Sequence, residues 1–215
     1  DEAMDRANMV PREQILRMAA GVRPDDVCNM QYTSGTTGFP KGVMLTHYNV
    51  VNDGKCIGDR MDLSTADRMM IQVPMFHCFG MVLAMTAAMT HGTSMYPITA
   101  FSPRKGLHCI NEKQITAFHG VPTMFIAELN HPDFATFDLT SLRTGIMAGS
   151  PCPIKVMQEV VEKMHMKDIC ITYGQTEASP GCTMSKTTDS LETRVNTVGG
   201  AMFGVECRIV DPETN

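Results

Sequence analysis

The sequence lacks the features that mark nucleic-acid-binding and membrane-spanning proteins. Its 18 basic residues are outnumbered by 23 acidic ones, and its longest basic cluster is the pair Arg104 and Lys105. Nucleic-acid-binding surfaces usually carry a cationic patch, so we expect no nucleic acid partner. A membrane-spanning helix needs ~18 apolar residues in a row, whereas the most apolar run, Val73 to Ala88, is interrupted by a proline, a histidine and a glycine. We therefore expect no transmembrane segment.

Metal-binding and disulfide patterns are also missing. None of the eight cysteines forms a Cys-x-x-Cys pair, and no His-Glu-x-x-His spacing occurs. With 215 residues, of which 43% are hydrophobic, the chain can build a core without disulfide staples. We expect reduced thiols in an intracellular protein, either cytoplasmic or, if the source is eukaryotic, mitochondrial.

Short apolar strands alternate with helical segments along the chain. The expected strands are Val27–Tyr32, Met69–Val73, Thr93–Ile98, Ile115–Gly120, Thr144–Ala148, Ile169–Tyr173 and Glu206–Val210. The expected helices are Val10–Ala20, His47–Arg60, Met81–Thr90, Pro103–Glu112, Pro122–Asn130 and Pro153–His165, the last with Pro153 in its first turn. This alternation predicts an α/β fold: a layered sandwich with mostly parallel β-sheets flanked by helices. Ligands of such sheets bind in the loops beyond the carboxyl ends of the strands.

A loop rich in glycine and hydroxyl groups follows the first expected strand. Three glycines let the backbone turn tightly, and Lys41 adds one mobile positive charge, so the loop suits a polyphosphate. Its candidate nucleotide-binding residues are Thr33, Ser34, Gly35, Thr36, Thr37, Gly38 and Lys41. A P-loop needs glycine before the lysine and a hydroxyl after it, but Pro40 and Gly42 stand there. We therefore reject a P-loop NTPase.

Three further segments carry groups that suit the same ligand. After the strand that ends at Tyr173, an aromatic face is followed by Gly174, Gln175, Thr176 and Glu177. Thr176 offers a hydroxyl to a phosphate, and Glu177 offers a hard oxygen to magnesium. A strand-to-helix turn contains Gly149, Ser150 and Pro151, and His77 and His119 lie near the ends of two other expected strands. Alone, each segment also fits a solvated turn or a core histidine.

Together these motifs resemble the adenylate-forming, or AMP-binding, superfamily. The segment from Thr33 to Gly42 is similar to its AMP-binding signature, and Tyr173 to Glu177 is similar to its Tyr-Gly-x-Thr-Glu block. The segments Arg143–Pro153 and Tyr173–Pro180 look like those of the medium-chain fatty acyl-CoA synthetases. The resemblance covers nearly the whole chain. It implies that residues 1–215 form an internal part of the large N-terminal domain, with the small C-terminal domain absent.

The resemblance also implies a reaction and a role for each candidate residue. A fatty or other carboxylic acid would be activated with ATP and Mg²⁺ to an acyl-adenylate, and coenzyme A would then take the acyl group. Lys41, His77, Thr176 and Glu177 are the implied catalytic residues, and Thr33 and Glu177 are the implied magnesium contacts. The turn at Gly149–Pro151 and the face of Tyr173 would contact adenine, and the family's acyl pocket passes near His119. Two alternatives stay open: transfer of the acyl group to a carrier protein, and a non-catalytic nucleotide-binding fragment. The acyl chain length and the oligomeric state stay open as well.

Overall fold

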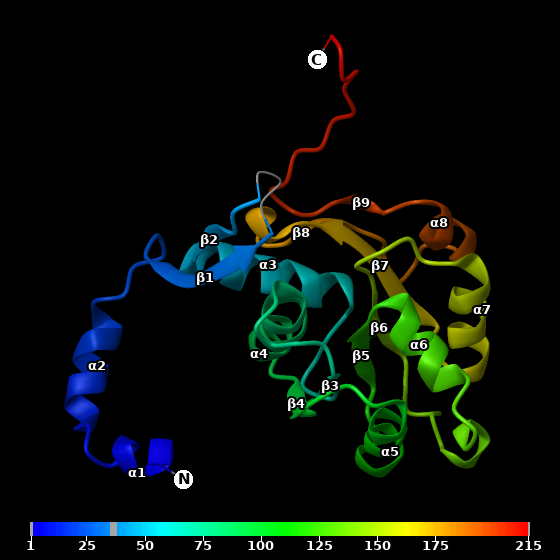
Figure 1. Ribbon diagram of the computed structural model, residues 1–215, viewed down its shortest axis with the longest axis horizontal. Coiled ribbons are helices and arrows are strands. Elements are labelled where there is room, and N and C mark those ends of the chain that lie inside the picture. The colour runs from blue at the N-terminus through cyan, green and yellow to red at the C-terminus, as the bar shows by residue number, and fades with distance from the viewer. Residues whose placement is uncertain (1, 35–37, 215) are drawn as a thin grey trace.

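The computed structural model describes residues 2–34 and 38–214. A seven-stranded sheet forms its centre, and a separate two-stranded hairpin lies beside it (Figure 1). The strands are β1 Val27–Thr33, β2 Lys41–Thr46, β3 Arg68–Ile71, β4 Ser94–Pro97, β5 Ala117–Gly120, β6 Thr144–Met147, β7 Asp168–Gly174, β8 Gly181–Met184 and β9 Gly200–Ala201. The α-helices are α1 Glu2–Ala7, α2 Arg12–Ala20, α3 His47–Arg60, α4 Ala87–Thr90, α5 Pro103–Lys113, α6 Pro122–Leu129, α7 Ile154–Lys163 and α8 Leu191–Asn196. A π-helix, η1 Phe79–Thr86, and two short 3-10 helices, η2 Phe134–Thr136 and η3 Thr176–Ala178, complete the described elements.

The order of strands in the large sheet is β4-β3-β5-β6-β7-β8-β9. The pairs from β4 to β7 are all parallel, and β8 and β9 add antiparallel strands at one side. The expected α/β fold with a mostly parallel sheet flanked by helices is therefore confirmed. Because β3, β5, β6 and β7 run in one direction, the segments that follow them meet at one edge.

Alternating residues of the central strands bury two separate cores. In β6, for example, Ile146 faces one core and Met147 faces the other. The first core is covered by α3, η1 and α4, and the second by α5, α6 and α7 (Figure 1). The central strands β5 and β6 are buried along their whole length, as expected when helices cover both sides of a parallel sheet.

The helix boundaries follow local capping signals. The expected helix His47–Arg60 is confirmed at both ends, and it begins with a reciprocal capping box between Thr46 and Asn49. Pro153 is the N-cap of α7 instead of a first-turn residue, because its ψ of 131° is extended. The expected helix Met81–Thr90 begins two residues earlier, as the π-helix η1, and α4 continues it. Thr86 lies inside this stretch and donates its hydroxyl to the Met81 carbonyl at 2.9 Å.

The glycine-rich loop follows the first expected strand, as predicted, and joins it to an antiparallel strand, β2, that was not expected. β1 pairs with β2, with Thr33 opposite Lys41, and neither strand joins the large sheet. Side chains on one hairpin face, including Gln31 and Leu45, are buried against α3 and η1, whereas Tyr32 on the other face is 73% exposed. The preceding helix α2 has no buried residue and projects away from the sheet (Figure 1).

The last expected strand, near the C-terminal end of the chain, does not form. Residues 206–210 form no strand, and Ile209 is fully exposed, so the strand expected at Glu206–Val210 is wrong. Its alternating pattern finds no neighbouring strand to pair with in the described part of the chain.

The cysteines, as expected, are all free thiols. No helix within residues 2–34 and 38–214 is long and apolar enough to cross a bilayer.

A buried ion pair joins the amino ends of three central strands. Asp67 is 4% exposed and accepts two hydrogen bonds from Arg143, at 2.9 Å from Nε and 2.7 Å from Nη2. Thr116 donates a third at 2.7 Å, and the Ser64 backbone N–H donates a fourth at 2.9 Å. Burial alone raises the pKa of Asp67, but the hydrogen bonds from Arg143 and Thr116 outweigh it and hold that pKa below its ordinary value. The pair therefore stabilises the fold above the ordinary aspartate pKa, and this stabilisation is lost as pH falls through the lower folded-state value.

Replacement of Asp67 by Asn should lower the free energy of unfolding by about 2 kcal/mol at pH 7, because it leaves the partly buried Arg143 without its counter-charge. Urea denaturation of the purified chain measures this loss, and the difference from wild type should shrink as the solution is acidified. Glu159→Gln is the control, since it removes an exposed ion pair with Lys163 and should stay close to wild type. Equal stability of the two variants would contradict the role of Asp67.

Candidate active site

Three of the predicted segments meet at one cavity of about 250 Å³ at the carboxyl edge of the sheet. His77 comes from the segment between β3 and η1, Gly149 follows β6, and Gly174, Gln175 and Thr176 follow β7. These segments lie far apart in the sequence, and the parallel order of the strands brings them together. Phe79, Leu83 and Ala148 add apolar walls. The cavity thus combines a glycine-lined backbone edge with an apolar side, as expected for a small-molecule site.

A second, open cavity adjoins the first and shares Gly149 and Gly174 with it. Ser150, Pro151 and Tyr173 line this second cavity, together with residues 195–199 at the end of α8 and directly after it. The side chain of Tyr173 is 55% exposed, so its aromatic face is available to a planar ligand. The predicted adenine-contacting residues therefore lie together, next to the cavity that holds Thr176.

The cavity floor contains a buried thiol between two of the predicted catalytic side chains. Cys78 is 3% exposed, and its Sγ lies 3.7 Å from His77 Nδ1 and 3.7 Å from Thr176 Oγ1. His77 Nδ1 also accepts a hydrogen bond from the Phe79 backbone N–H at 3.1 Å. The neutral His77 ring therefore carries its proton on Nε2, and Nδ1 fixes the orientation of the ring. Burial raises the pKa of the Cys78 thiol, so Cys78 stays neutral at pH 7.

His119 lies in the core and holds two elements together. It is fully buried at the end of β5, donates from Nε2 to the Leu83 carbonyl at 2.8 Å, and accepts at Nδ1 from the Ile146 N–H at 3.1 Å. Its ring stacks on Phe79 with centroids 5.8 Å apart. Burial lowers the pKa of His119 to about 4, so the ring is neutral and both nitrogens are occupied. His119 positions η1 against β6, and among the described residues its ring is closed to a ligand.

The glycine-rich loop joins the two strands of the hairpin. Residues Gly35, Thr36 and Thr37 lie outside the described part of the chain. Of the other predicted residues, Ser34, Gly38 and Lys41 are exposed and Thr33 is half-buried. Gly38 has φ of 86°, a conformation that favours glycine. Strand β2 lies in contact with η3, so the hairpin approaches the segment that carries Thr176 and Glu177.

Glu177 is an exposed residue of η3. Within residues 2–34 and 38–214, no three histidine, cysteine or acidic side chains cluster as metal ligands. The predicted magnesium contacts, Glu177 and the half-buried Thr33, each offer a side-chain oxygen.

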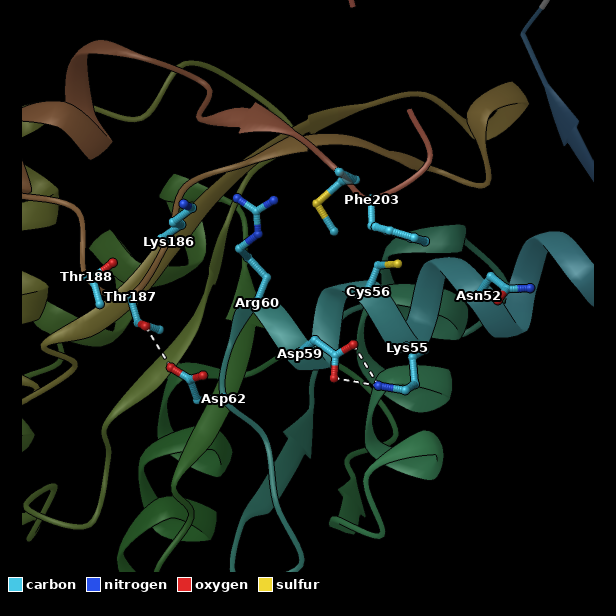
Figure 2. A pocket seen from close by; sticks show the side chains of 11 residues that line it. Asn52, Lys55, Cys56, Asp59, Arg60, Asp62, Lys186, Thr187, Thr188 and Phe203 are labelled. Carbon is cyan, nitrogen blue, oxygen red and sulfur yellow. Dashed lines mark hydrogen bonds and ion pairs between the residues drawn. The ribbon is translucent and has the colours of Figure 1, made fainter. Parts of the chain in front are cut away.

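A larger hollow of about 710 Å³ lies between the outer face of α3 and the segments around Lys186 and Phe203 (Figure 2). Most of the charged side chains that line it form ion pairs or hydrogen bonds within the protein. Lys55 pairs with Asp59, Thr187 donates to Asp62, and Arg60 binds two backbone carbonyls. None of the predicted site residues lines it. We therefore interpret it as a solvated cleft, separate from the candidate site.

The motif-based prediction missed residues that shape the cavity. Cys78 lies within the motif that contains His77, but its buried position shows only in the structure. Pro180 and Gly181 also line the cavity, and Asp53 of α3 accepts a hydrogen bond from the Gly181 N–H at 3.1 Å. Asp53 lies on the more buried side of an amphipathic helix. A carboxylate at such a position is unusual, and this was the signal in the sequence that could have marked Asp53 as a candidate.

The chain is similar to known proteins in both sequence and fold. The chain is 57% identical to the putative acyl-CoA synthetase YngI of Bacillus subtilis over 190 residues, which are 88% of this chain and 35% of that protein. It is 44% identical to the acyl-CoA ligase sidI of Aspergillus fumigatus over 99% of this chain and 36% of that protein. It is 40% identical to the mitochondrial medium-chain acyl-CoA ligase ACSF2 of mouse over 88% of this chain and 32% of that protein.

Solved structures agree with these relatives. The anthranilate CoA ligase AuaEII in complex with anthranoyl-AMP aligns with a TM-score of 0.79 and 27% identity, over 89% of this chain and 37% of that one. ATP-bound MatB of Rhodopseudomonas palustris aligns with a TM-score of 0.76 and 27% identity, over 94% of this chain and 41% of that one. The chain thus spans about a third of the length of its curated relatives. The AMP-binding enzyme family matches residues 2–215, and the chain belongs to that family.

Proposed function

We propose that the chain is part of the large N-terminal domain of an ATP-dependent acyl-CoA ligase and carries most of its nucleotide site. The observation that carries this proposal is the meeting of His77, Gly149 and Thr176 at one cavity, with the glycine-rich hairpin beside it. The printed names of the relatives, which are acyl-CoA synthetases and ligases, supply the reaction class.

The reaction overcomes the poor leaving group of a carboxylic acid. The carboxylate oxygen attacks the α-phosphorus of ATP, the bond to the bridging oxygen breaks, and pyrophosphate leaves. The thiol of coenzyme A then attacks the acyl carbonyl, and AMP leaves with the electron pair of the acyl–oxygen bond. The first step gathers negative charge at phosphorus, so it depends on positioned donors more than on an acid or base.

The described residues divide this task by position. Thr176 offers its hydroxyl to the α-phosphate from the cavity, while Lys41 and the hairpin residues Thr33, Ser34 and Gly38 hold the outer phosphates. The same proposal covers Gly35, Thr36 and Thr37. Tyr173 and the Gly149–Pro151 turn hold adenine in the adjoining cavity, together with Gly174 and Gln175. His77 presents Nε2–H to the reacting phosphate or carboxylate, because its Nδ1 is already bound to the Phe79 N–H.

Magnesium would be held by Glu177 and Thr33 together with phosphate oxygens. One exposed carboxylate and one hydroxyl agree with the preference of this ion for few protein oxygens. The ion supplies charge neutralisation at the phosphates. The acyl chain would follow the apolar wall of Phe79, Leu83 and Ala148. The free thiols and the use of ATP both favour an intracellular enzyme.

Replacement of Lys41 by Ala should lower kcat/KM for ATP by about 10²-fold, because one cationic donor to the phosphates is lost. Acyl-adenylate formation by the full-length enzyme measures the effect. Lys41 is exposed, so the melting temperature should not change. Lys105→Ala, an exposed lysine on α5, is the matched control and should keep wild-type kinetics. Wild-type kinetics in the Lys41 variant would refute its role at the phosphates.

Replacement of Glu177 by Gln should lower the adenylation rate by about 10²-fold and raise the magnesium concentration needed for half-maximal rate. The glutamine keeps a hydrogen-bonding side chain but loses the charge that attracts the cation. Glu162→Gln on the exposed side of α7 removes one negative charge elsewhere and should change neither quantity. An unchanged magnesium dependence in the Glu177 variant would exclude it as a magnesium ligand.

A further inference from the structure

Asp53 is a half-buried carboxylate at the back of the candidate site. Helix α3 packs against β8 (Figure 1), and Asp53 Oδ2 accepts a hydrogen bond from the N–H of Gly181, the first residue of β8, at 3.1 Å. Gly181 itself lines the cavity with Thr176. Among the described residues, no ion pair includes Asp53, so its charge has no counter-ion. An unpaired buried carboxylate is costly, which makes its position next to the site informative.

The contact between Asp53 and Gly181 depends on the absence of a side chain at position 181. A Cβ placed on Gly181 would lie 2.8 Å from Asp53 Oδ1, which is closer than real Cβ contacts come. Gly181 ends a backbone loop in which the Gln175 N–H donates to the Pro180 carbonyl at 3.1 Å. Gly174 packs directly on that same carbonyl. Asp53 therefore holds the end of the segment 174–181, whose other residues include the proposed phosphate-contacting Thr176.

The charge state of Asp53 is set by burial and not by neighbouring cations. Burial raises the pKa of Asp53 to about 7, and the hydrogen bond from Gly181 lowers it only in part. Among the described residues, the groups whose pKa the charge of Asp53 raises are thiols: Cys56 on its own helix, Cys78 before η1, and Cys182 on β8. Burial, with a smaller effect of Asp53 itself, raises the pKa of each thiol, so all three are neutral near pH 7. By contrast, Asp67 is paired with Arg143, and its pKa is lowered.

Thermodynamic linkage gives the direction of the effect. If the segment 174–181 opens, Asp53 gains water and its pKa falls toward the ordinary aspartate value. The closed segment binds the proton more tightly than the open one, so closure is favoured at low pH and weakened as pH rises through about 7. A neutral Asp53 also avoids repulsion of a polyphosphate bound nearby. Both effects therefore favour the closed segment and nucleotide binding when Asp53 is protonated.

We propose that Asp53 is a positioning residue whose neutral form holds the backbone at Gly181 and thereby keeps Thr176 placed for the nucleotide, whereas its ionised form loosens this segment. The proposal rests on the proposed function for its catalytic consequence. Its structural part concerns only the contact between α3 and the segment 174–181.

Hydrogen exchange of the Gly181 amide tests the structural part without any ligand. In the full-length enzyme, the protection factor of this amide should fall by about fivefold between pH 6 and pH 7 and by about twofold between pH 7 and pH 8, the limit for opening that fully solvates the Asp53 carboxyl. Asp53→Asn should abolish this fall, because the amide oxygen still accepts from Gly181 and does not titrate. Asp53→Ala should lower protection at every pH. Protection that is the same in all three proteins would overturn the proposal.

The pH dependence of adenylation tests the catalytic part. For wild type, kcat/KM for ATP should decline as pH rises through about 7, and Asp53→Asn should remove that decline. Asp59→Asn on the exposed side of α3 is the matched control and should retain it. A decline that persists in Asp53→Asn belongs to another group and overturns the proposal. Failure of wild type to form acyl-adenylate at any pH would refute the proposed function instead, and the exchange of Gly181 would still decide whether Asp53 holds the segment.

Discussion

The parallel pairing of β5, β6 and β7 is the constraint on which the candidate site depends. Each of these strands is fixed to its neighbour by backbone hydrogen bonds, so the segments after Met147 and Gly174 must leave the sheet side by side. The pairing itself needs close packing. A side chain at Gly145 would run into the Phe118 carbonyl, and its Cβ would lie 2.6 Å from the terminal methyl of Met166. The site is thus positioned by the core and not by its own loops.

The contrast between two aspartates shows how this scaffold separates stability from positioning. Asp67 is buried with a bidentate arginine and joins the amino ends of the strands, where no candidate site residue lies. Asp53 is half-buried at the opposite edge with a single backbone donor, where the cavity is. A paired carboxylate strengthens the fold at neutral pH, whereas an unpaired one remains sensitive to its protonation. The carboxylate without a counter-ion, Asp53, therefore lies at the carboxyl edge of the sheet, beside the cavity.

The strands and helices of the parallel sheet could be predicted because each carries a local signal. The apolar runs at Thr144–Ala148 and Ile169–Tyr173 mark buried strands, and Thr46 with Asn49 marks the start of α3. The strand Lys41–Thr46 was not predicted, since it is short and is defined by its pairing with β1. The strand expected at Glu206–Val210 failed for the converse reason: its pattern is regular, but the described residues offer it no partner. Cys78 and Asp53 could not be predicted as site residues, because their contacts with Thr176 and Gly181 join segments that are distant in sequence.

The convergence of three loops on one nucleotide cavity is the central claim, and isotope exchange between pyrophosphate and ATP tests it most directly. If the cavity activates a carboxylate by adenylation, the full-length enzyme should incorporate labelled pyrophosphate into ATP only when a carboxylic acid and magnesium are present, and without any need for coenzyme A. Omission of coenzyme A isolates the first step, in which the residues around Thr176 are proposed to act. Acid-dependent release of ADP and inorganic phosphate, with no exchange of pyrophosphate, would contradict the account.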